Sequence, residues 1–77
     1  MKSKEAVAVF GAGSWGTAIA KVLAENSLDV YLWGREVNVV DSITRFRENR
    51  LFLPGVKLPD SIYPRNDLKD DFFNVKF

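Results

Sequence analysis

The chain has 77 residues, of which 47% are hydrophobic and 27% charged, so it is large enough for one small domain at most. Its formal net charge is +1 and its 11 lysines and arginines are spread along the sequence, which gives no electrostatic case for binding nucleic acid or an anionic membrane. It contains neither cysteine nor histidine, so disulfides are excluded and a metal site is not expected.

The first apolar run, Ala6 to Phe10, predicts a strand of a parallel sheet that is buried on both faces. This run is shorter than the roughly 7–15 apolar residues of a secretory signal core, so we expect no signal peptide, no membrane span and a cytoplasmic location. From Ser14 the apolar positions change to a helical period, and this helix should end near residues 25–27. Its apolar positions are Trp15, Ala18, Ile19, Val22 and Leu23.

The next segments repeat the pattern of strand and helix. A second strand is predicted from Asp29 to Trp33 and a second helix from Glu36 to Asn49. Strands and helices that alternate at this spacing indicate βαβ units and a right-handed parallel sheet. Ser61 to Tyr63 predicts a short third strand, which should lie at a sheet edge or end at Pro64 because proline has no amide hydrogen.

The remaining segments predict a turn, the end of the second helix and a short helical turn. Pro54-Gly55 is a turn signal, and the basic segment from Arg45 to Arg50 predicts a solvated helix end. Asn66 or Asp67 is placed to cap a short helical turn, and the last six residues begin a strand-like pattern. The fold class is therefore α/β: the βαβαβ half of an incomplete Rossmann-type nucleotide-binding domain, a doubly wound parallel sheet, over residues 1–77.

Gly11, Gly13 and Gly16 form the pattern G-x-G-x-x-G between the first strand and the first helix, which is the context that dinucleotide binding requires. Gly11 permits the tight turn, Gly13 lets a diphosphate approach the backbone, and Gly16 lets the helix pack closely on the strand. The helix N-terminus offers unpaired amides and roughly +0.5 of a charge to the diphosphate. A glycine-rich connection without a ligand is the alternative. A P-loop is disfavoured because no Gly-Lys-Ser/Thr follows the last glycine.

Three further residues are candidate cofactor contacts. Ser14 can donate its amide and hydroxyl to phosphate or act as the helix N-cap. The Trp15 ring can pack in the core or contact a ligand, and its amide can serve phosphate in either case. Arg35 follows the second strand, where it can stack on adenine, pair with the 2′-phosphate of NADP or remain a solvated charge. We interpret Glu36 as a helix-start residue, and both NADP and NAD stay open.

The segments FGAGSWGTAIA, VYLWGR and NRLFLPGVKLPDSI resemble the bacterial-type NAD(P)-dependent glycerol-3-phosphate dehydrogenases over about residues 6–68. In that family the corresponding residues bind NAD(P)H, and the resemblance carries this role onto Ser14, Trp15 and Arg35. Phe52 stands where the family often has an aromatic residue near the cofactor, with core packing as the alternative.

The resemblance implies a reversible reduction of dihydroxyacetone phosphate to sn-glycerol 3-phosphate for phospholipid synthesis, by an enzyme that is a homodimer when complete. The family's catalytic lysine lies in a C-terminal helical domain that has no counterpart in this sequence, so no catalytic residue is assigned. We expect the isolated chain to be inactive. Two alternatives stay open: a non-catalytic Rossmann module that binds or senses a dinucleotide, and another small hydroxyacid or ketoacid dehydrogenase.

Overall fold

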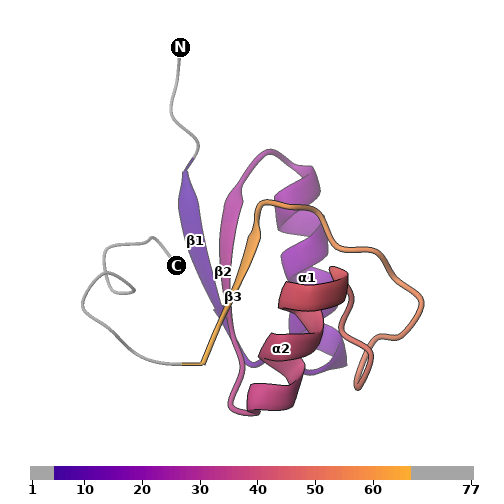
Figure 1. The fold of residues 1–77 in the computed structure, drawn as a ribbon. Coiled ribbons are helices and arrows are strands. Elements are labelled where there is room, and N and C mark those ends of the chain that lie inside the picture. The colour runs from indigo at the N-terminus through magenta and orange to yellow at the C-terminus, as the bar shows by residue number, and fades with distance from the viewer. Residues whose placement is uncertain (1–4, 67–77) are drawn as a thin grey trace.

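The computed structural model describes residues 5–66, in which strands and helices alternate along the chain (Figure 1). The elements are β1 (Ala6–Phe10), α1 (Ser14–Glu25), β2 (Asp29–Trp33), α2 (Val37–Phe46) and β3 (Ile62–Arg65). The strands form a parallel sheet in the order β1-β2-β3. The βαβαβ half of a Rossmann-type fold that the sequence predicts is therefore confirmed.

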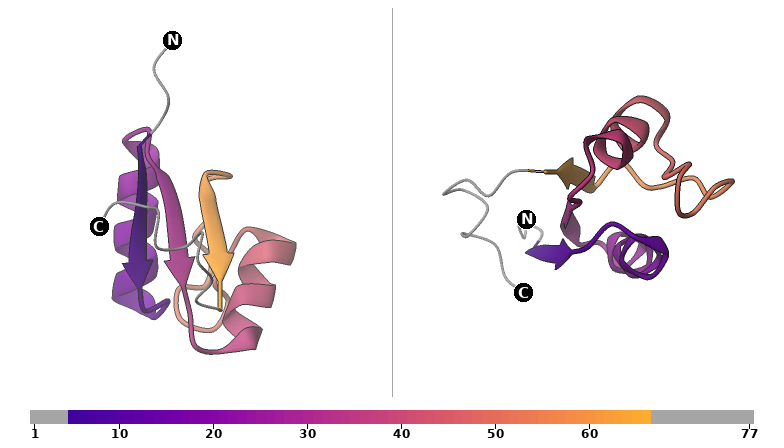
Figure 2. Two further views of the ribbon diagram at one scale, coloured as in Figure 1. Left: turned by 90° about the vertical axis from the view of Figure 1, so that its left-hand side faces the viewer. Right: turned by 90° about the horizontal axis from the view of Figure 1, so that it is seen from below.

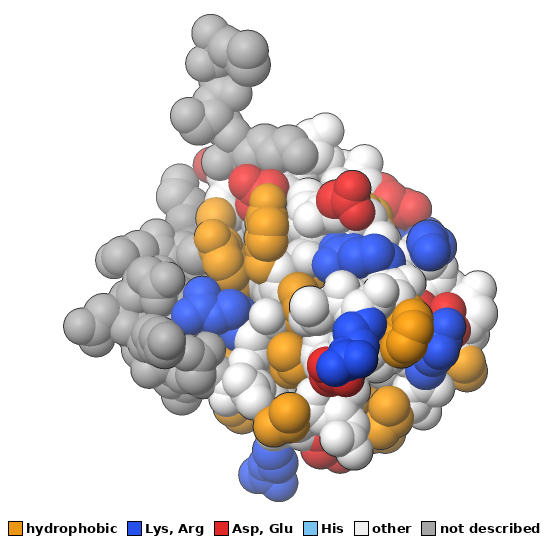
Figure 3. All heavy atoms as spheres, in the orientation of Figure 1, with side chains coloured by type: hydrophobic (Ala, Val, Ile, Leu, Met, Phe, Trp, Pro, Cys, Tyr) orange, Lys and Arg blue, Asp and Glu red, His pale blue; other side chains and the backbone are white. Residues whose placement is uncertain are grey.

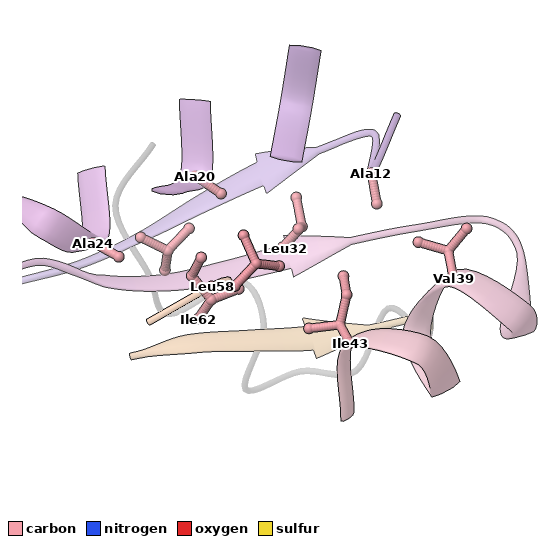
Figure 4. Packing of buried hydrophobic residues seen from close by; sticks show 9 residues of the cluster. Ala12, Ala20, Ala24, Leu32, Val39, Ile43, Leu58 and Ile62 are labelled. Atoms are coloured by element: carbon pink, nitrogen blue, oxygen red, sulfur yellow. The ribbon is translucent and has the colours of Figure 1, made fainter. Parts of the chain in front are cut away.

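Both helices cover the same face of the sheet (Figure 2). Val30 and Leu32 of the central strand β2 point toward the helices and are fully buried. In the parallel register Val7 lies opposite Val30, which in turn lies opposite Ile62 of β3, so these side chains share one face. The core between the sheet and the helices consists of Ala12, Ala20, Ala24, Val30, Leu32, Val39, Ile43, Leu58 and Ile62 (Figure 4).

The other face of the sheet has no helix over it in the described part of the chain (Figure 2). It carries two aromatic pairs: the rings of Phe10 and Trp33 lie 6.4 Å apart, and those of Tyr31 and Tyr63 lie 5.3 Å apart. The residues of β1 are half-buried or exposed. The prediction that β1 is buried on both faces is therefore wrong for the described residues, because only the helix side is covered.

Most of the apolar stripe of α1 lies at the surface, although Leu23 is half-buried and packs against the core. The helix turns Thr17, Ala20 and Ala24 toward the sheet, and these small side chains let it pack closely. Trp15 is 83% exposed and Val22 is 57% exposed. The stripe lines a shallow apolar hollow formed by Trp15, Ala18, Ile19, Val22 and Leu23. None of the described helices is both long and apolar enough to span a bilayer.

This orientation of α1 predicts different effects for two lysine substitutions on the same helix. Val22→Lys should change the free energy of unfolding by less than about 0.5 kcal/mol, because the side chain lies at the surface. Ala20→Lys should lower it by more than about 2 kcal/mol, because Ala20 is fully buried and a charge there has no partner. Urea denaturation followed by circular dichroism measures both changes. Equal losses in the two variants would contradict this orientation.

The helix α2 ends at Phe46, short of the predicted Asn49, because Arg47 adopts a left-handed backbone conformation with φ of 53°. The Arg47 guanidinium donates hydrogen bonds to the carbonyls of Pro59 and Ile62, the latter at 2.8 Å. The prediction of a solvated basic segment is therefore wrong for Arg47, which ties the end of α2 to the start of β3.

The two charged residues of α2, Asp41 and Arg45, form one pair of opposite sign. Arg45 donates to the Asp41 carboxylate at 2.9 Å, and both side chains are more than half exposed. Figure 3 shows acidic and basic side chains beside one another on this face, with single apolar groups between them. Exposed pairs of this kind contribute roughly 0.3–0.5 kcal/mol each. The pair adds charge to the outer side of α2 but does not determine the fold.

The strand β3 lies at the edge of the described sheet and runs through Pro64, which agrees with the missing amide hydrogen of proline. The Pro54-Gly55 turn is also observed, with a φ of 81° at Gly55. The predicted helical turn after Asn66 and the strand-like pattern of the last six residues fall outside the described residues.

Candidate functional site

The glycine turn joins the end of β1 to the start of α1. Gly11 has a φ of 110°, which side chains rarely adopt, and its amide donates to the Trp33 carbonyl at 2.8 Å. A Cβ on Gly16 would lie 1.7 Å from the Gly11 carbonyl oxygen. The structural roles expected of Gly11 and Gly16, a tight turn and a close helix–strand contact, are thus present in the geometry.

Gly13 faces open space. A Cβ built on it would meet nothing within 4 Å, so its backbone is accessible from outside. Gly13 is also the N-cap of α1, and no side chain caps the helix. The interpretation of Ser14 as the N-cap is therefore wrong. In the first hydrogen bond of the helix the Thr17 amide donates to the Gly13 carbonyl at 3.0 Å. The amides of Ser14, Trp15 and Gly16 therefore precede the hydrogen-bonded part of the helix.

The start of α1 has the chemistry of an anion site. Its first turn contains no acidic residue, so the unpaired amides and the helix dipole act on the space beside Gly13 without an opposing charge. A diphosphate fits this surface, because Gly13 presents no side chain to exclude it. Binding by Gly11, Gly13 and Gly16 stays a prediction.

For Ser14 and Trp15 the structure rules out one of the two roles that the sequence left open. The Ser14 hydroxyl donates to the Phe52 carbonyl at 2.5 Å and so joins α1 to the loop that follows α2. Core packing of the Trp15 ring is wrong for the described structure, because the ring is on the surface. Its amide remains among those at the helix start, so phosphate contacts from Ser14 and Trp15 stay predictions.

Phe52 lies in a loop that closes on itself beside the glycine turn. Its side chain is 38% exposed, which disagrees with a residue packed in the core. The Leu53 amide donates to the Asn49 carbonyl at 2.8 Å, and the Gly55 amide donates to the Glu48 carboxylate at 2.8 Å. The loop thus places the backbone of Phe52 next to the start of α1, and contact between Phe52 and a cofactor stays a prediction.

Arg35 follows β2 at the carboxyl ends of the strands, where the glycine turn also lies. A Cβ on Gly34 would lie 2.9 Å from the Ala12 Cβ, so the end of β2 is in contact with the turn. The Arg35 side chain is exposed and forms no ion pair with another residue of the described range 5–66. The Glu36 carbonyl accepts from the Val39 amide at 3.1 Å, which confirms Glu36 as a helix-start residue. A cofactor contact from Arg35 stays a prediction.

Sequence reasoning missed the polar pair Asn49 and Thr17, which lies directly beneath the turn. Both residues are fully buried. The Asn49 side-chain amide donates to the Ala12 carbonyl and to the Thr17 hydroxyl, each at 2.9 Å. One signal was available: Thr17 is a polar residue on the inner face of α1, which otherwise presents alanines, and a buried hydroxyl needs a partner.

Comparisons with known proteins agree with this geometry. Residues 6–76 match the family model described as the N-terminus of NAD-dependent glycerol-3-phosphate dehydrogenase. The glycerol-3-phosphate dehydrogenase [NAD(P)+] of Xanthomonas oryzae pv. oryzae is 49% identical over 67 residues, covering 87% of this chain and 20% of the relative. The corresponding protein of Geobacillus kaustophilus is 52% identical over 64 residues, covering 83% of this chain and 19% of the relative.

A solved structure shows the same fold. The crystal structure of glycerol-3-phosphate dehydrogenase from Coxiella burnetii superposes with a TM-score of 0.84 at 39% identity, over 94% of this chain and 22% of that one. The chain therefore spans about a fifth of the length of the curated relatives that it matches.

Proposed function

We propose that this chain, which belongs to the NAD-dependent glycerol-3-phosphate dehydrogenase family, supplies part of the dinucleotide site of an enzyme that reduces dihydroxyacetone phosphate to sn-glycerol 3-phosphate. On this proposal residues 1–77 are the N-terminal part of an NAD(P)-binding Rossmann domain. The groups that bind and protonate the substrate belong to the remaining four fifths of the relatives' length.

One observation carries the proposal: the open space at Gly13 lies at the start of α1, before the first helical hydrogen bond. The amides of Ser14, Trp15 and Gly16 would bind the diphosphate there, and Arg35 at the end of β2 would contact the adenosine half. When bound, NADH or NADPH supplies the hydride for the reduction. The chain's own part is to hold and orient the cofactor.

The names of the relatives favour this activity over the two alternatives, a non-catalytic dinucleotide module and another small hydroxyacid or ketoacid dehydrogenase. We also propose that the complete enzyme is a homodimer, works in the cytoplasm and supplies glycerol 3-phosphate for phospholipid synthesis. Size-exclusion chromatography with light scattering tests the first of these points.

A chimera tests the enzymatic proposal. Residues 1–77 would replace the matching first fifth of the Xanthomonas relative, and NADPH oxidation would be followed at 340 nm. We expect the chimera to oxidise NADPH only when dihydroxyacetone phosphate is added, and the 77-residue chain alone to bind the dinucleotide without turnover. A folded chimera that binds NADPH but leaves it unchanged would contradict the proposed reaction.

Arg35→Ala tests the cofactor contact. We expect it to weaken NADPH binding about tenfold and NADH binding less than about threefold, because only NADPH offers a 2′-phosphate to the guanidinium. Isothermal titration with the two cofactors measures the difference. Arg45→Ala is the matched control, because Arg45 is also exposed but lies at the opposite end of α2 and pairs with Asp41. Equal losses for both cofactors would rule out the 2′-phosphate role.

A further inference from the structure

We propose that Asn49 is a positioning residue of the dinucleotide site: it fixes the glycine turn and the Phe52 loop in a single arrangement without touching the cofactor. This inference rests on the proposed function, because it assumes that the turn binds a diphosphate. The residue lies after α2, 37 residues along the sequence from Ala12, the residue of the turn to which it donates.

The side chain of Asn49 bonds to three separate segments, through both hydrogens of its amide nitrogen and through its amide oxygen. Its amide nitrogen donates to the Ala12 carbonyl in the turn and to the Thr17 hydroxyl in α1. Its amide oxygen accepts from the Phe52 backbone amide at 3.1 Å. Asn49 is fully buried, so water does not replace a bond that is lost.

Asn49 is itself held in place from α2. The Ser42 hydroxyl donates to the Glu48 carbonyl at 2.6 Å and accepts from the Arg50 amide at 3.1 Å. These two residues flank Asn49, so its backbone is fixed on both sides by one side chain of the helix. The backbone position of Asn49 is therefore set by the buried helix residue Ser42 and not by the loop alone.

The bond to Ala12 determines which way the next amide points. A trans peptide is planar, with its C=O and N–H on opposite sides. Because the Ala12 carbonyl is directed inward to Asn49, the Gly13 N–H is directed away from the buried side. That amide and the open space at Gly13 are then available to the same ligand.

The same side chain places the aromatic loop. Asn49 holds the Phe52 amide, while Ser14 at the start of α1 donates to the Phe52 carbonyl. The two bonds fix the backbone of Phe52 on both sides, one from beneath the turn and one from the helix start. Loss of Asn49 would therefore loosen the turn and the loop together.

Titration of the 77-residue chain with NADH tests the inference, using Asn49→Ala and the matched control Ile43→Val. Ile43 is equally buried and lies on α2, but it makes no polar contact with the turn, so its substitution loosens the same core without changing the amides. Both variants would be studied under conditions in which circular dichroism shows each to be folded. We expect Asn49→Ala to weaken NADH binding at least about tenfold and Ile43→Val less than about twofold.

The possible outcomes separate this inference from the proposed function. A parent chain that binds no NADH contradicts the proposed function, whereas a folded Asn49→Ala chain that binds as well as the parent overturns the inference alone. If Asn49→Ala does not fold, NMR of the parent chain decides. We expect slow hydrogen exchange at the Asn49 side-chain amide and a shift of the Gly13 amide signal on NADH addition; rapid exchange or an unmoved Gly13 signal overturns the inference.

Discussion

Gly16→Ala is expected to lower the free energy of unfolding by more than about 3 kcal/mol, above the usual cost of an added methyl group. The new Cβ would lie 1.7 Å from the Gly11 oxygen and 2.9 Å from the Gly11 carbonyl carbon. Both contacts are with backbone atoms, so no side-chain rotation relieves them and α1 would have to move away from β1. A domain of this size has only roughly 4–12 kcal/mol of stability in total, so much of the population should unfold.

Urea denaturation of the purified chain, followed by circular dichroism, measures this loss. Gly13→Ala is the control, because it adds the same methyl group to the same turn but into open space. A Gly16→Ala chain that unfolds at the same urea concentration as the parent would show that the close contact between α1 and β1 is absent in solution.

The strands β1 and β2 were predictable because the signals for them are local. The bounds of β1 and β2 agree with the apolar runs Ala6–Phe10 and Asp29–Trp33, and the glycines mark the passage from strand to helix. The end of α2 was not predictable in this way. The end of α2 depends on the left-handed conformation of Arg47. It also depends on the hydrogen bonds that the Arg47 guanidinium donates to the carbonyls of Pro59 and Ile62, which lie beyond the next loop.

Hydrophobic periodicity alone did not predict which face α1 turns to the sheet. A period of 3.6 residues identifies an apolar stripe but not the element that covers it. Here the close contact at Gly16 brings the helix so near the sheet that the side chains buried between them are the small ones of Thr17, Ala20 and Ala24. The bulky side chains of Trp15, Ile19 and Val22 are therefore directed outward and are exposed.

The residues of the candidate site also divide into those that the sequence predicts and one that only the fold reveals. The glycines were proposed from their spacing, Ser14, Trp15 and Arg35 from their positions at the helix start and after the second strand, and Phe52 from the resemblance to a family. Asn49 was not found, because its bonds to Ala12 and Thr17 span 37 and 32 residues of sequence. The pattern around Asn49 reads as the end of a basic helix, and only the folded chain shows that its side chain lies beneath the turn.

Gly13→Ala is expected to leave the fold intact and to weaken dinucleotide binding by about ten- to a hundredfold. At Gly13 the φ of −79° is open to alanine, so the substitution should keep the free energy of unfolding or raise it by about 0.4–1 kcal/mol through the unfolded state. The methyl group would occupy the space through which a diphosphate approaches the backbone. Isothermal titration with NADH and with NADPH measures the loss of affinity.

The control for binding is Val22→Lys, which changes the outer surface of α1 away from the turn and should bind like the parent. The two glycine variants together distinguish a ligand site from a structural connection. A glycine-rich connection without a ligand also predicts that Gly16→Ala unfolds the chain, since that clash is within the protein. Only a diphosphate site predicts that Gly13→Ala keeps its stability and still loses affinity. A Gly13→Ala chain that binds both cofactors as tightly as the parent would therefore refute the diphosphate site at this turn.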